Sequence, residues 1–174
     1  LEFVEPMDKA VQDQRYFILC MRAELHANLH RFDESLADWD WAISLAADGF
    51  RDINRIQRLR TVVLSGDFVR GIAELDVLIE KISDSTNGRQ HYLGEAARVL
   101  AIAHRAAVND ASTEEILGLA EGWAKRAVES LRQLLASGKL SLDFTESNED
   151  YASLRPRADF QEVLQAARQK PSLP

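Results

Sequence analysis

Two histidines of this sequence, His26 and His30, stand four residues apart, a spacing that places two imidazoles on one face of a helix. Such a pair can hold a metal ion, and the acidic side chains of Glu24 and Asp33 stand nearby. The pair lacks the glutamate of the His-Glu-x-x-His pattern on which metalloproteases depend. We therefore predict that His26 packs or makes a turn contact, and that the chain binds no metal.

The other reactive side chains also favour structural roles. Cys20 is the only cysteine, which excludes an intramolecular disulfide and any cysteine-rich metal cluster. It has no cationic neighbour in the sequence, so a small buried apolar residue is the better interpretation than a nucleophile. The adjacent acids Asp33-Glu34, Glu114-Glu115 and Glu149-Asp150 stand where helices are expected to begin, where the helix dipole explains them. The sequence predicts neither an enzyme nor a cofactor.

Charge limits the partners. Among 174 residues there are 28 acidic side chains against 21 Lys and Arg, giving a net charge of -7. Nucleic acids and anionic membranes are disfavoured, because phosphates require a basic face. No apolar run approaches the 18 residues of a membrane-spanning helix, and the beginning of the chain lacks the pattern of a signal peptide. We expect a cytoplasmic protein whose partner is another protein or a peptide.

The elements that carry these residues are predicted to be helices alone. No proline occurs between Pro6 and Pro156, and the stretch is rich in good helix formers. Glycines and capping residues then divide it: Gly49 and Gly138 are expected to end helices, and Asp52 and Ser112 to begin them. The predicted helices lie at about 13–29, 33–47, 52–65, 67–82, 89–108, 113–136 and 156–169, with a loop at 83–88. Gly118 and Gly122 are interpreted as points of close helix approach.

A repeated pattern of residue types connects these helices. The pattern is aromatic, small, large apolar, then small or apolar, and its second copy begins 36 residues after the first. A third, partial copy follows 49 residues later. The three copies are Phe32, Ser35, Trp39 and Ala42; Phe68, Gly71, Leu75 and Leu78; and Ala120, Ala124 and Ala127.

This pattern resembles the tetratricopeptide repeat, a helix–turn–helix unit of 34 residues. The best match is segment 22–45, where Ala23 stands at the small position and Trp39 at a packing position. The resemblance implies an all-α, right-handed array of about three units, at residues 15–47, 52–83 and 89–137, in a single domain. Residues 139–170 would add a tail with a capping helix that lays Phe160, Val163 and Leu164 on the sixth helix.

The end of the chain is similar to the C-terminal repeat regions of large bacterial multidomain proteins, often planctomycete-type protein kinases. The similar segments are 124–131, Gly138 and 151–161. The chain has no glycine-rich loop, no His-Arg-Asp and no Asp-Phe-Gly, so the similarity implies no kinase activity.

In the repeat family the first helix of each unit lines a concave groove that binds peptides or helices. Carried over by position, the candidate groove residues are Cys20, Glu24, Ala27, Asn28, Ile56, Arg60, Val63 and Leu64, followed by Leu93, Ala97 and Ala101. Family members that clamp acidic chaperone tails have Lys and Asn where Cys20 and Glu24 stand here, which argues against such a clamp.

Two readings of the groove remain open: Ile56, Val63 and Leu64 bind a partner, or they pack on the chain's own tail. Two functions also remain open. The favoured one is a protein-interaction or scaffold module. The alternative is a regulatory or spacer domain of a larger bacterial enzyme such as a serine/threonine kinase.

Overall fold

The computed structural model describes residues 9–82, 89–110 and 113–169, and in these ranges the chain is helical with short turns and no strand. The predicted all-α class is confirmed. The predicted loop at 83–88 and the predicted cap Ser112 lie outside the described residues. The elements are α1 (Lys9–Asn28), α2 (Phe32–Leu45), α3 (Asp48–Leu64), α4 (Phe68–Ile82), α5 (Arg89–Asp110), α6 (Glu114–Ala136), α7 (Leu142–Ser147), the 3-10 helix η1 (Glu149–Leu154) and α8 (Ala158–Arg168).

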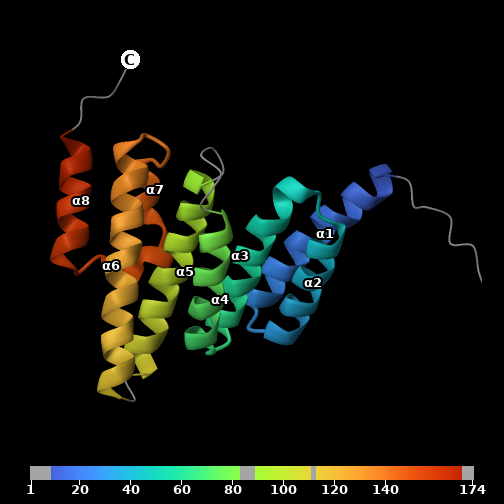
Figure 1. The fold of residues 1–174 in the computed structure, drawn as a ribbon, viewed down its shortest axis with the longest axis horizontal. Helices are drawn as coiled ribbons and strands as arrows, with labels where there is room; N and C mark the ends of the chain where they lie inside the picture. Colours follow the sequence, from blue (N-terminus) through green and yellow to red (C-terminus); the bar gives the residue numbers. More distant parts are fainter. Residues whose placement is uncertain (1–8, 83–88, 111–112, 170–174) are drawn as a thin grey trace, which may run out of the picture.

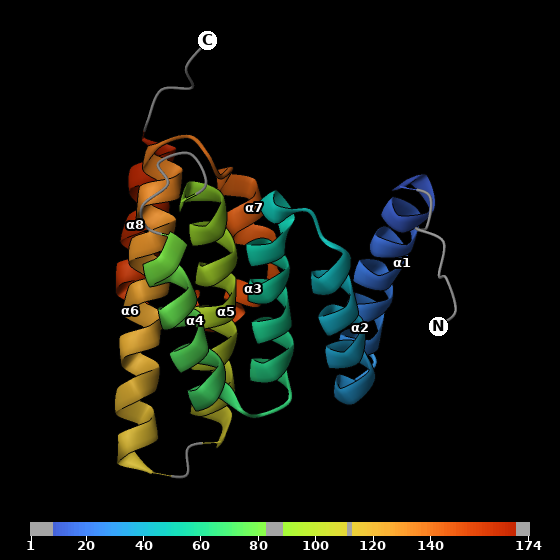
Figure 2. The same ribbon diagram turned by 45° about the vertical axis from the view of Figure 1, so that its right-hand side comes forward.

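The helices stand side by side in a row, with α1 and α2 at one end and α6 and α8 at the other (Figure 1). From α1 to α6, each helix contacts the next one in the sequence, and α3 also contacts α5. The main apolar core extends from α3 through α8. A second, smaller core lies between α1 and α2, and this hairpin stands at its own end of the row (Figure 2).

The helix boundaries follow the 36-residue displacement found in the sequence. α2 begins at Phe32 and α4 at Phe68, while α1 ends at Asn28 and α3 at Leu64. The repeated packing positions are also alike in burial, since Trp39 and Leu75 are both buried. The start of the second helix and the end of the first are thus displaced by 36 residues between the two helix pairs.

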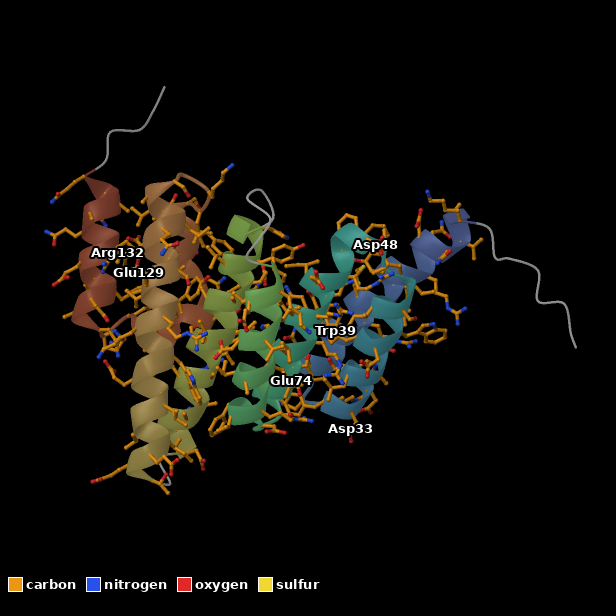
Figure 3. All side chains as sticks on the ribbon, viewed as in Figure 1. Asp33, Trp39, Asp48, Glu74, Glu129 and Arg132 are labelled. Atoms are coloured by element: carbon orange, nitrogen blue, oxygen red, sulfur yellow. The ribbon has the colours of Figure 1, made fainter. Side chains whose placement is uncertain are left out.

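Trp39 lies between α1 and α2, where the repeat pattern predicted it. It is 3% exposed and forms the small core with Leu19, Ala23 and Ala42 (Figure 3). The small residues of α1 bring the helices close together, and the indole fills the space beside that contact.

Two predicted helix boundaries are wrong. Gly49 does not end α2 but lies in the first turn of α3, and Asp52 is inside α3, where it pairs with Arg55. The cause is a short extended connection at Ala46 and Ala47, whose backbones have ψ of 136° and 153°. This connection ends one helix and begins the next without a left-handed glycine.

Other helix ends have the glycines and capping residues that are expected there. Gly66 and Gly138 have positive φ, 99° and 69°, after α3 and α6. Thr113 is the N-cap of α6, since its side chain accepts a hydrogen bond from the Ile116 amide at 3.2 Å. The sequence placed that cap one residue too early.

The glycine that allows two helices to approach closely is in α4, and not in α6 as predicted. An added Cβ at Gly118 or Gly122 of α6 would meet nothing within 4 Å, so these glycines allow no close contact. An added Cβ at Gly71 of α4 would lie 2.7 Å from the Val63 Cγ2 atom. The approach that requires glycine is therefore between α4 and α3.

The tail closes the other end of the row. α8 packs against α6, and its Phe160, Val163 and Leu164 are buried at 0–4% exposure. The predicted capping contact is confirmed. Before it, η1 lies against α5 with Tyr151 and Leu154 fully buried, so the tail belongs to the core rather than to a linker.

Candidate binding surface

The second-unit groove positions face the chain's own core. Ile56 and Val63 are completely buried, and Leu64 packs against the same core. Arg60 is half-buried, and its Nη2 atom lies 3.4 Å from Asp150 of η1. In the third unit Ala97 and Ala101 are also completely buried and Leu93 is half-buried.

An ion-pair network joins η1 to this face. Asp150, 8% exposed, accepts a hydrogen bond from Arg98 Nε at 2.8 Å besides its contact with Arg60. Arg98 also pairs with Glu95, which accepts a hydrogen bond from Gln57 at 2.6 Å. A buried carboxylate must be paired, because its desolvation is otherwise costly. The network therefore holds the tail where a groove-bound peptide was expected.

A histidine–serine contact adds to this attachment. Ser153 Oγ donates to the Ala101 carbonyl at 3.1 Å and lies within hydrogen-bond distance, 3.1 Å, of His104 Nδ1. Burial lowers the pKa of His104, and the nearby Arg157 lowers it further. The serine proton is committed to a carbonyl, so the pair has the geometry of a structural contact and not of an activated nucleophile.

The first-unit groove positions differ in exposure. Cys20 is half-buried beside Tyr16, and burial raises the pKa of its thiol, which disfavours the reactive thiolate. Ala27 is buried, whereas Glu24 and Asn28 are exposed on α1. These last two line an open hollow of about 580 Å³, together with Ile18, Met21, Arg22 and Leu25.

The hollow belongs to a larger apolar surface on α1. Five large apolar side chains, four of them on α1 and one in the turn directly after it, are each more than half exposed. We name them the α1 stripe: Phe17, Ile18, Met21, Leu25 and Leu29. Their exposed fractions run from 53% to 73%. A contiguous exposed patch of this kind is typical of an interaction surface.

The α1 stripe is exposed because α1 has two apolar faces. The face with the small residues Ala23 and Ala27 packs against α2, where only small residues allow close contact. The face with the large residues is left uncovered. In the sequence Phe17, Met21, Leu25 and Leu29 recur at a spacing of four residues. This second apolar face on one helix is the signal that could have indicated the surface.

The two histidines have different surroundings. His26 Nε2 lies 3.8 Å from Asp38, which itself pairs with Arg22 at 2.5 Å. His30 has φ of 57° in the turn after α1, and its ring meets Phe32 edge-on. Across residues 9–82, 89–110 and 113–169, no group of three or more His, Cys, Asp or Glu side chains is arranged to hold a metal ion.

No protein-family model, curated protein or solved structure matches this chain. In the described part of the chain no helix combines the length and the apolar character needed to cross a membrane. The assignment of a function therefore depends on the surface itself.

Proposed function

We propose that this chain is a non-enzymatic, tetratricopeptide-like protein-binding module that receives an amphipathic helix of a partner protein on the α1 stripe. The observation that supports this is the exposure of five large apolar side chains on one helical face. Amphipathic helices bind through anchors at i, i+3, i+4 and i+7, which match such a stripe. The proposal moves the binding surface from the predicted groove positions of α3 and α5, most of which lie in the main core, to the exposed face of α1.

The hollow gives the partner helix a place for an anchor. Met21 and Leu25 form its apolar part, and Arg22, Glu24 and Asn28 supply polar groups around them. Covering the α1 stripe would bury on the order of 500 Å² on this chain, which approaches one side of an ordinary protein interface. An apolar centre with a polar rim is the usual composition of such interfaces.

A regulatory or spacer domain remains the second candidate. The α1 stripe lies at the end of the helix row, where a neighbouring domain of a longer polypeptide would also pack. In that case the occupant of the stripe would come from the same polypeptide and not from a separate protein.

The test is affinity capture with three versions of the chain as bait. Met21→Glu/Leu25→Glu places two charges on the α1 stripe, at side chains 73% and 56% exposed, so the fold should be retained. Val69→Glu/Val77→Glu is the matched control, because both residues are exposed on α4 away from the stripe. We expect a specific partner to be captured by the wild type and the control, and lost with the stripe variant.

Equal capture by all three baits would refute the proposal. Capture that requires a segment of the parent polypeptide would instead favour the spacer role. Circular dichroism melting of each bait confirms that charge on the surface, and not unfolding, causes the loss.

A further inference from the structure

A small pocket of about 160 Å³ lies between α5, the end of α6, α7 and η1, on the other side of the molecule's core from the α1 hairpin. One face of α5 forms a wall of it, since residues 91, 94, 95 and 98 recur at helical spacing. The lining residues are His91, Gly94, Glu95, Arg98, Leu134, Lys139, Leu140, Phe144 and Tyr151.

Tyr151 gives this pocket an unused hydrogen-bonding group. Its side chain is completely buried, yet its hydroxyl has no hydrogen-bond partner. The charged groups that act on the phenol are Arg98, Glu95 and Asp150, and the first two line the pocket. Buried hydroxyls are nearly always hydrogen-bonded, because an unpaired one loses its bonds to water.

We infer that this pocket binds a small monocarboxylate, with the Tyr151 hydroxyl donating a hydrogen bond to the carboxylate. The hydrocarbon part of the ligand would lie against Leu134, Leu140 and Phe144. Burial raises the pKa of Tyr151 far above its usual value, so the phenol remains a donor at every working pH.

The charges of the lining favour an anion. Arg98 and Lys139 are cationic and Glu95 is anionic. Arg98 pairs with Glu95 and with Asp150 of η1, so Lys139 is the lining cation that an anion would meet. The Glu95 carboxylate already accepts hydrogen bonds from Gln57 and Arg98, which offsets its repulsion. Lys139 has no ion-pair partner within the described residues and stands exposed at the rim. Its ammonium is thus available to an incoming carboxylate.

The size of the pocket limits the ligand. A volume of about 160 Å³ holds roughly five groups of the size of a water molecule. A carboxylate with three or four carbon atoms of hydrocarbon fits that space, whereas a nucleotide or a sugar does not. Isobutyrate is therefore a suitable probe, and isobutyramide is its neutral analogue of the same shape.

The experiment is a titration of the full chain with each probe, followed by amide chemical shifts in two-dimensional NMR. Isobutyrate should give saturable shifts centred on Gly94 and Leu140, and isobutyramide should bind at least tenfold more weakly. Tyr151→Phe removes one oxygen atom and should weaken isobutyrate at least tenfold. Tyr92→Phe is the matched control: Tyr92 is a half-buried tyrosine of α5 outside the pocket lining, and its loss should leave the affinity unchanged.

Three results would overturn the inference: equal binding of the two probes, unchanged affinity in Tyr151→Phe, or no saturable shift near the pocket, which would show that the pocket holds only water. Lys139→Gln keeps the test decisive if Tyr151→Phe fails to fold, because Lys139 is exposed and its loss should also weaken isobutyrate. The stripe variant Met21→Glu/Leu25→Glu should bind isobutyrate like the wild type, so this site and the proposed partner surface succeed or fail separately.

Discussion

Replacing Trp39 by alanine should open the α1/α2 hairpin while the rest of the chain remains folded. The indole is 3% exposed and is the largest side chain of the small core between these helices. Truncating a buried tryptophan to alanine costs about 3–5 kcal/mol, because apolar contact is lost and a cavity remains.

Polar side chains attach the hairpin to α3, among them an exposed ion pair in which Arg58 Nε donates to Asp40 at 2.7 Å. Ser35 Oγ lies 3.2 Å from Thr61 Oγ1, and Tyr16 hydrogen-bonds to Asn54 at 3.1–3.3 Å. Each such contact contributes about 0.5–1.5 kcal/mol. The loss at Trp39 therefore equals or exceeds what these contacts supply, and the hairpin should open as a local unit.

Hydrogen exchange measured by mass spectrometry checks this expectation. In Trp39→Ala, peptides from residues 9–45 should lose protection, and peptides from residues 89–136 should retain it. Trp41→Ala is the control on the same helix, because Trp41 is 42% exposed and its ring contact with Arg15 contributes only about 0.5–1 kcal/mol. Uniform loss of protection along the chain, or equal behaviour of the two variants, would refute the reasoning.

Three further predictions concern Phe160 in the tail, His104 in α5, and two glycines. Phe160→Ala should lower the unfolding free energy by about 3–5 kcal/mol in urea, since the ring is fully buried between α8 and α6; a loss below about 1 kcal/mol would contradict the capping role of α8. His104 has a folded-state pKa below its unfolded value of about 6.5, so the unfolded chain binds more protons and stability should fall as the pH drops through 6.5 toward the folded pKa. Urea unfolding at pH 7.5 and 5.5 measures this, and His104→Gln should reduce the dependence. Gly71→Ala should lower the unfolding free energy by about 1–3 kcal/mol, because its Cβ would press on Val63. Gly118→Ala should raise the unfolding free energy by about 0.5–1 kcal/mol, because its Cβ meets open space. Thermal melting measures both variants, and a stability change of the same sign in both would contradict the reasoning.

Local signals in the sequence predicted most of the helices. Six long helices and α8 lie close to their predicted ranges, because long proline-free segments with apolar residues at helical spacing leave few alternatives. The helix ends were predicted less well than the helices themselves. The turn between α2 and α3 was misplaced since Ala46 and Ala47 carry no turn signal, and their extended backbone follows from the packing of the two helices.

The binding surface was harder to foresee than the fold. The repeat resemblance placed Glu24 and Asn28 among the candidate groove residues, and in the structure both line the hollow of α1. The sequence left open whether Ile56 and Val63 bind a partner or pack on the chain itself, and the structure buries both in the main core. The contact between Arg60 of α3 and Asp150 of η1 connects residues 90 positions apart in the sequence.

The sequence by itself determined the helices, the 36-residue register and the burial of Trp39, because these depend on residues near one another in the chain. Only the tertiary structure decided which apolar face of α1 is covered and that the tail packs on α5 and α6. Both outcomes depend on which surfaces pack together when distant parts of the chain meet. The face of α1 with Ala23 and Ala27 contacts α2, because small residues allow the closer approach. η1 lies against α5, where Asp150 pairs with Arg98 of α5 and with Arg60 of α3.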